Sequence, residues 1–374
     1  MFHQSTSFMH RLLPHKELQS IYLSSAIRAF GISLLGIFLP LYLYHELNFG
    51  LSITLGYYIL NSIIFAVITP FAAQYAAKYG LKHAILLSVP PYVLFAFLLY
   101  QNPSPFDLIL SSIALGVSLA FYWMGMNVLF QKISHKKLHG TENAKKLAYS
   151  MIAAMLGPII GGFIIQTTSF SAVFLLSAFA MVISSIILFS HTEQHIPFTL
   201  HLKEVASPVS LPSALFMVSH GALTMTQSVL WPLFIFLFLG TYFQVGFLTS
   251  FLALLSTLII LVMGKLSDSV NKHRIIQITS IIDSALYIFT TYARTITHLL
   301  ILVVCNSFIH ATRDAPLLAY EMDNAKKNIV AYFANREVYL CIGRVLLLSI
   351  VLLTEQVTHG FITQAILNIA LIIA

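Results

Sequence analysis

The sequence has 374 residues, of which 58% are hydrophobic and only 9% are charged. Soluble domains carry about 25% charged residues, so this composition excludes a soluble globular protein and indicates a polytopic membrane protein. The formal net charge of +7 would also be compatible with a nucleic-acid-binding protein, but the positions of the basic residues explain it as membrane topology.

A membrane-spanning helix needs about 20 mostly apolar residues. Twelve stretches of the chain meet this requirement or come near it. We expect helices near residues 18–44, 52–77, 84–100, 107–131, 146–167, 171–190, 211–239, 243–263, 275–293, 298–321, 329–353 and 360–374, the last being short for a span. The predicted fold class is an all-α polytopic membrane protein.

The connections between these stretches alternate in charge. Fifteen of the 20 Lys and Arg residues lie on one side, in residues 1–17, 78–83, 132–146, 191–210, 264–274 and 322–328. The opposite side carries only Arg294, and the remaining four lie inside spans. Because Lys and Arg stay in the cytoplasm during insertion, we expect a multi-pass protein of the cell membrane with both termini cytoplasmic.

Other features set limits on function. Cys305 and Cys341 lie in apolar segments, so no structural disulfide is expected, and the chain has no zinc-ligand spacing. Residues 1–17 lack the short apolar run of a removable signal peptide. Neither a glycine-rich nucleotide-binding loop nor a catalytic signature stands out. We therefore predict no metal, no cofactor and no enzyme activity.

The polar stretch 191–210 divides the chain into two predicted six-helix bundles, residues 1–190 and 211–374. Landmarks of the first half recur in the second at offsets of 190, 186 and 191 residues: Tyr122-Trp123 with Thr312-Arg313, Gly157-Pro158 with Gly343-Arg344, and Ala73 with Gly264. Duplicated halves predict such a near-constant offset.

Residues 264–274, GKLSDSVNKHR, resemble the G-x-L-x-D-R-x-G-R-R loop between helices eight and nine of the major facilitator superfamily. Gly264, Leu266 and Asp268 match, with Lys272 and Arg274 nearby. The equivalent turn of the first half, at 73–82, has Lys78, Gly80 and Lys82, but Ala77 replaces the family's Asp. The resemblance implies that both turns are gating loops, the first lacking its latch. The alternative is that they only set topology.

Helix five carries Gly157-Pro158-Ile159-Ile160-Gly161-Gly162, which resembles the GPxxGG ending of a motif in proton-linked antiporters of the superfamily. Ala153 stands where an upstream glycine is expected, and close helix packing alone also explains the segment. The whole-chain resemblance implies two six-helix bundles related by a pseudo-two-fold axis, which close alternately around a small-molecule substrate.

Ionisable residues inside spans usually face a bundle interior or a water-filled cavity. Six of them lie within roughly 4–8 Å of the midplane, from a rise of 1.5 Å per residue. They are Arg28 in helix one, Arg313 and Asp314 in helix ten, and Arg336, Glu337 and Arg344 in helix eleven. The positive surplus favours an anionic substrate, and Asp283 of helix nine is expected to be peripheral. The alternative is that Arg313/Glu337 and Arg336/Asp314 pairs only join helices ten and eleven.

Further candidates for substrate binding lie in the helices that line the cavity of the superfamily. His220, Gln227 and Trp231 share one face of helix seven, and Asn306 and His310 share one face of helix ten with Arg313. Helix four adds Trp123 and Asn127. For the histidines and tryptophans, simple packing is the alternative. Pro40, Pro70, Pro232 and Pro316 are expected to kink helices one, two, seven and ten.

Together these features predict a secondary transporter for a small solute, with an anion as the first hypothesis. Proton coupling would use Asp314, Glu337 or His310. Two alternatives stay open: a drug/proton antiporter for apolar cations, and a non-transporting sensor or scaffold. The predicted antiporter would need an acidic residue in the first-half cavity, and the sequence offers none there. The expected partners are the substrate and the lipid bilayer, without nucleic acid, and a monomer is expected.

Overall fold

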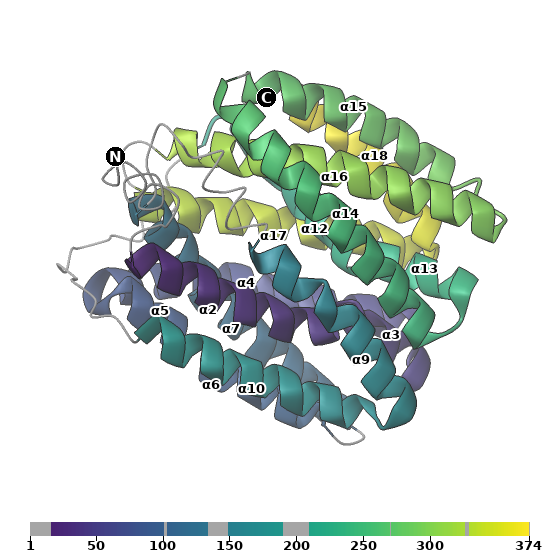
Figure 1. Ribbon diagram of the computed structural model, residues 1–374, viewed down its shortest axis with the longest axis horizontal. Coiled ribbons are helices and arrows are strands. Elements are labelled where there is room, and N and C mark those ends of the chain that lie inside the picture. Colours follow the sequence, from purple (N-terminus) through teal and green to yellow (C-terminus); the bar gives the residue numbers. More distant parts are fainter. Residues whose placement is uncertain are drawn as a thin grey trace, which may run out of the picture.

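The computed structural model describes residues 16–100, 103–133, 149–189, 209–269, 271–325 and 329–373. Within these ranges the regular elements are helices, which confirms the predicted all-α fold class (Figure 1). The predicted linker, residues 191–210, lies almost entirely outside the described ranges.

The first helical group extends from α2 to α10. It contains α2 (Lys16–Gly36), α3 (Leu39–Leu41), a π-helical turn (Tyr42–Glu46), α4 (Gly50–Tyr79), α5 (Leu81–Leu87), α6 (Val89–Leu98), α7 (Pro105–Ile133), α9 (Leu156–Thr167) and α10 (Phe170–Phe189). The span that ends with α9 begins at Tyr149.

The second helical group extends from α12 to α18. It contains α12 (Leu211–Met225), a π-helical turn (Thr226–Leu230), α13 (Trp231–Leu239), α14 (Tyr242–Ser269), α15 (Lys272–Thr290), α16 (Ile296–Asn324), α17 (Ile329–Thr354) and α18 (Val357–Ile373). In the described chain, ten helical stretches are long and apolar enough to cross a membrane. With α15 and the 17-residue α18 they make the twelve predicted helices.

Two of the four prolines predicted to kink helices lie where helical segments restart. Pro40 lies at the start of α3, where its missing N–H removes no helical hydrogen bond. Pro232 lies at the start of α13, directly after the second π-helical turn. Pro70 and Pro316, by contrast, lie inside the continuous helices α4 and α16.

The helices pack in two groups that meet along two seams. In the first group α2 packs on α9 and α10, and α4 packs on α7. In the second group α12 packs on α17 and α18, and α15 packs on α16 and α18. The seams between the groups are α4 against α17 and α9 against α14. Figure 1 shows the purple-to-teal group below the green-to-yellow group.

The two ends of the bundle differ in chemistry. One end carries the α4–α5 turn at Gly80, the start of α15 at Lys272 and the end of α16 at Asn324. We call it the basic end because the predicted basic turns lie there. The α9–α10 and α13–α14 turns lie at the opposite end.

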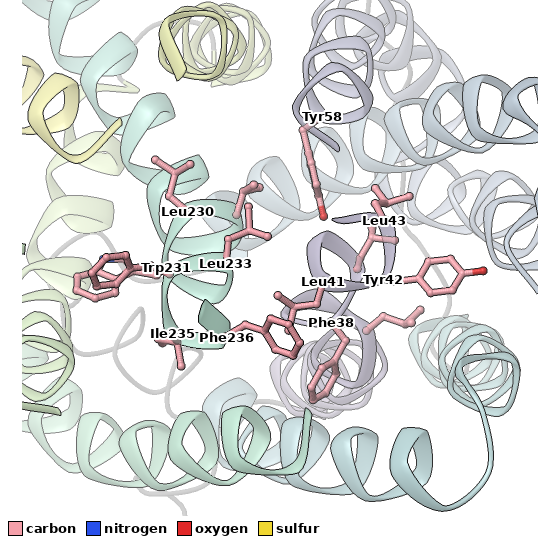
Figure 2. Close-up of a cluster of buried hydrophobic side chains, with 14 of the residues drawn as sticks. Phe38, Leu41, Tyr42, Leu43, Tyr58, Leu230, Trp231, Leu233, Ile235 and Phe236 are labelled. Carbon is pink, nitrogen blue, oxygen red and sulfur yellow. The ribbon is translucent and has the colours of Figure 1, made fainter. Parts of the chain in front are cut away.

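At the opposite end, aromatic and aliphatic side chains of the two groups meet. Figure 2 shows Phe38 and Leu41 facing Leu233 and Phe236, and all four are at most 5% exposed. Nearby, Tyr242 of α14 stacks on Phe236 with 5.3 Å between ring centroids. This packing closes the first helices of the two groups against each other.

Hydrogen bonds reinforce the same contact. The Tyr242 hydroxyl donates to Glu46 Oε2 at 3.0 Å and lies 3.0 Å from His45 Nδ1. Glu46 and His45 belong to the first π-helical turn, whereas Tyr242 begins α14. A polar latch therefore joins the two groups at the opposite end.

Candidate substrate cavity

A cavity of about 460 Å³ lies between the two helical groups, in the half of the bundle next to the basic end. α2, α7, α12, α16 and α17 contribute to its wall. Seven residues predicted from the sequence line it: Arg28, Trp123, Asn127, His220, Arg336, Glu337 and Arg344. Glu321, which lies at the last residue of the predicted tenth span, lines it as well. Residues from both halves thus surround one space.

Arg28 of α2 is 1% exposed and lies against the first-group wall of this cavity. Its Cζ atom lies 3.5 Å from the centroid of the Tyr122 ring. Its Nη1 donates to Ser88 Oγ at 3.3 Å, while Nε and Nη2 have no hydrogen-bond partner in the described chain. Arg28 therefore carries a buried charge without a carboxylate partner among the described residues.

Arg344 of α17 lines the same cavity from the second group and is 9% exposed. Its Nε donates to Thr224 Oγ1 at 3.2 Å, and its Cζ lies 4.9 Å from the centroid of the Phe65 ring. Its Nη1 lies 3.9 Å from Cys341 Sγ. These partners are neutral, so within the described residues Arg344 also has no carboxylate partner.

The remaining charges of the cavity form one network. Arg336 lies 2.7 Å from Glu321 Oε2 through Nη2 and donates from Nη1 to Glu337 Oε1 at 2.5 Å. His220 Nδ1 lies 2.9 Å from Glu321 Oε1. Asn127 donates to Glu337 at 3.1 Å and so links α7 to α17. Arg336 thus contacts both carboxylates, and the predicted alternative that it pairs with Asp314 is wrong.

The sequence-based pairing of Arg313 with Glu337 is also wrong. Arg313 Nη1 donates to Asp283 Oδ2 of α15 at 2.9 Å, and both side chains are 0% exposed. Asn368 of α18 donates to the same carboxylate oxygen at 3.3 Å. Asp283, expected to be peripheral, is therefore the counter-ion of Arg313. In the described chain, Arg313 does not line the 460 Å³ cavity.

A second cavity, of about 210 Å³, lies beside this ion pair. The predicted residues Gln227, Trp231, Asn306, His310 and Asp314 line it. Gln227 Nε2 lies 2.7 Å from His310 Nε2 and donates to Asn306 Oδ1 at 3.1 Å. Gln227 of helix seven thus contacts the polar stripe of helix ten, whereas His220 of the same predicted stripe lines the larger cavity.

The family model described as Major Facilitator Superfamily matches residues 21–347. The chain belongs to the major facilitator superfamily. It is therefore a multi-pass membrane protein and a secondary transporter for a small molecule, and its family consists of transporters rather than enzymes. The twelve-helix arrangement described above is the fold of this superfamily.

Solved structures of the superfamily match nearly the whole chain. The human organic anion transporter MFSD10 (TETRAN) has a TM-score of 0.70 at 12% identity, over 96% of this chain and 99% of that one. A bacterial homologue of the iron transporter ferroportin, in the outward-facing state, has 0.71 at 11% identity, over 96% and 97%. The Escherichia coli fucose:proton symporter FucP has 0.67 at 12% identity, over 95% and 97%. These similarities establish the fold alone.

A relative at the sequence level is the uncharacterized protein YqgE of Bacillus subtilis (strain 168). It is 29% identical over 171 residues, which is 44% of this chain and 39% of that protein. The chain thus aligns with less than half the length of this relative.

The turns that resemble superfamily gating loops are only partly described. Gly80 ends α4 with φ +115°, a backbone conformation that favours glycine. Lys78 lies over the Tyr79 ring, and Lys82 is 1% exposed. Arg274 lies in the first turn of α15, whose N-cap Asn271 accepts from the Arg274 backbone N–H. Gly264 and Asp268 lie in α14 at positions whose side chains are outside the described structure.

The helix-five motif of the superfamily lies at a seam between the groups. A Cβ atom on Gly157 would clash with Ser33 of α2, and one on Gly162 would lie 2.8 Å from the Tyr242 carbonyl oxygen of α14. The glycines therefore permit α9 to pack closely on α2 of its own group and on α14 of the second group. This geometry explains the motif by close packing and carries no information about the direction of transport.

Proposed function

We propose that this transporter moves a small organic anion, which binds in the 460 Å³ cavity between Arg28 and Arg344. The observation that carries the proposal is that both arginines line the cavity without a carboxylate partner among the described residues. Buried charges are normally paired, so an anionic ligand is the partner that these two arginines lack.

The charge balance of the described cavity wall supports this assignment. Arg28, Arg336 and Arg344 face Glu321 and Glu337, which leaves one positive charge in excess. The sequence-based argument for an anion counted Arg313 in the surplus, but Asp283 neutralises that residue. The surplus therefore rests on Arg28 and Arg344.

The drug-antiporter alternative has less support from the cavity. A lipophilic cation needs an acidic partner, and Glu321 and Glu337 are both held by Arg336. The non-transporting alternative is disfavoured by membership of a transporter superfamily.

The cavity lies next to the basic end, and toward the opposite end the side chains around Phe38 and Phe236 pack the two helical groups together. If Lys and Arg mark the cytoplasm, this arrangement corresponds to an inward-facing state in a cell membrane, with both termini cytoplasmic. The two seams, α4–α17 and α9–α14, are the surfaces on which two bundles, residues 1–190 and 211–374, would rock. Transport by a monomer is sufficient for this cycle.

Proton coupling belongs to the same proposal. His220 and Glu321 are 2.9 Å apart on the cavity wall, and Glu321 is shared with Arg336. A proton taken up by the His220–Glu321 pair makes the cavity wall around the substrate more positive. His310, beside Asp283 and Asp314 at 3.9 and 3.8 Å, is a second candidate outside the cavity.

The test is uptake by proteoliposomes that contain the purified protein, with a panel of organic anions, sugars and lipophilic cations. We expect flux of an anion, lost in Arg28→Gln and Arg344→Gln but retained in the control Arg294→Gln, which changes an exposed arginine at the opposite end. A ligand at 100 times its dissociation constant also stabilises the folded state by about 2.7 kcal/mol, which guides the choice of anion. Flux of cations alone, or full anion flux in both variants, contradicts the proposal.

A further inference from the structure

The guanidinium group of Arg28 is held in one orientation by the protein around it. The Tyr122 ring covers one face, with 3.5 Å between Cζ and the ring centroid. Nη1 donates to Ser88 Oγ at 3.3 Å. Ser88 Oγ in turn donates its own hydrogen to the Ile85 carbonyl at 2.6 Å, so toward Arg28 it acts as an acceptor. The group is therefore positioned before any ligand binds.

Two donors of this guanidinium are unused. Nε and Nη2 are buried and have no hydrogen-bond partner in the described chain. These nitrogens lie on the same edge of the planar group, and their two parallel N–H bonds match the two oxygens of a carboxylate. A buried charged donor without a partner is costly. The edge therefore has the form of a bidentate carboxylate site that is covered in this structure, and a ligand reaches it when the covering side chains of the cavity wall move.

Most of the remaining wall is apolar. Ile32, Trp123, Phe130, Ala154, Phe333 and Leu340 line the cavity together with Arg28. Such a wall favours an apolar or aromatic ligand body, because burial of apolar surface supplies the main favourable free energy of binding. It disfavours sugars and small inorganic ions, whose hydration it cannot replace.

We propose that the ligand is an amphipathic monocarboxylate. Its carboxylate binds the Nε/Nη2 edge of Arg28, and its apolar body packs on Trp123, Phe130 and Phe333. The inference rests on the proposed anion transport and adds the class of anion. One negative charge neutralises the single positive excess of the described wall, which accounts for a monoanion rather than a dianion.

The test is isothermal titration of the full-length protein with four probes: 1-naphthoate, its neutral analogue 1-naphthamide, acetate and inorganic phosphate. We expect 1-naphthoate to bind, and the other three to bind at least about tenfold more weakly, because each lacks the charge, the apolar body or the monoanionic group. Phosphate or acetate that binds as tightly as 1-naphthoate overturns the inference but leaves anion transport standing. If none of the anions binds and no anion is transported, the proposed function fails with it.

Arg28→Lys separates the bidentate edge from charge alone. A lysine keeps the positive charge but presents no planar fork, so we expect 1-naphthoate affinity to fall at least about tenfold. The control is the same change at the opposite end, Arg294→Lys, with unchanged affinity. Equal affinity in Arg28→Lys and the unmodified protein overturns the inference.

Ser88→Ala provides a second variant if Arg28→Lys does not fold. It removes only the acceptor of Nη1 and is expected to weaken 1-naphthoate binding several-fold. Binding to Ser88→Ala as tight as to the unmodified protein overturns the positioning of Arg28 described above.

Discussion

The ion pair between Asp283 of α15 and Arg313 of α16 predicts a large contribution to stability. Both side chains are 0% exposed, and Arg313 Nη1 lies 2.9 Å from Asp283 Oδ2. Asp283→Asn leaves the buried guanidinium without a counter-charge. Breaking a buried pair in this way costs about 3–5 kcal/mol. We expect the free energy of unfolding to fall by about that amount.

The assay is chemical unfolding of the purified protein in detergent, followed by tryptophan fluorescence. The matched control is Asp323→Asn, whose pair with Lys272 is shorter at 2.6 Å but whose side chains are 39% and 21% exposed. An exposed ion pair contributes about 1 kcal/mol or less to the free energy of unfolding. The difference between the two variants therefore reports the effect of burial and not of the distance between the charges.

The double variant Asp283→Asn/Arg313→Gln completes the thermodynamic cycle. It removes both charges, so we expect it to be more stable than Asp283→Asn alone. The reasoning is refuted if Asp283→Asn and Asp323→Asn cost the same, or if the losses at Asp283 and Arg313 simply add.

Two further predictions concern the opposite end of the bundle. Tyr242→Phe keeps the ring but removes the hydrogen bond to Glu46 and the contact with His45, at about 1 kcal/mol each. We expect longer distances between spin labels on the α3–α4 and α13–α14 turns by pulsed electron paramagnetic resonance, and an unchanged distribution would count against the latch. A cysteine in place of Arg294, in a Cys305→Ser background, is expected to react with a membrane-impermeant maleimide in intact cells, because basic loops stay cytoplasmic. Labelling only after lysis would reverse the predicted topology.

The helical fold is largely predictable from the sequence because span length and loop charge are local properties. Apolar stretches of about 20 residues have few structural options in a bilayer. The last helix, predicted at 360–374, begins three residues earlier, at Val357. Pro40 and Pro232 lie where helical segments restart, in keeping with the backbone donor that proline lacks, whereas Pro70 and Pro316 lie inside the continuous helices α4 and α16.

The sequence predicted which charged residues lie near the middle of their helices, but it did not predict which of them form ion pairs. Depth follows from position along a helix, and Arg28, Arg336 and Arg344, all predicted near the midplane, line one cavity. Glu321 was missed because the predicted span ended at that residue, whereas α16 continues to Asn324. Its position as an acidic residue near the end of an apolar helix was the signal that could have marked it.

The sequence by itself therefore determined the class of protein, the number of helices, the uneven distribution of basic residues between the predicted loops and the helices that carry the buried charges. Only the tertiary structure decided which charges are paired. Pairing depends on the rotation of each helix about its axis and on which helices are neighbours, and a shift of a few ångströms changes the partner. That geometry assigns Asp283 to Arg313 and Glu321 and Glu337 to Arg336. It leaves Arg28 and Arg344 as the charges that face the cavity without a carboxylate partner in the described chain.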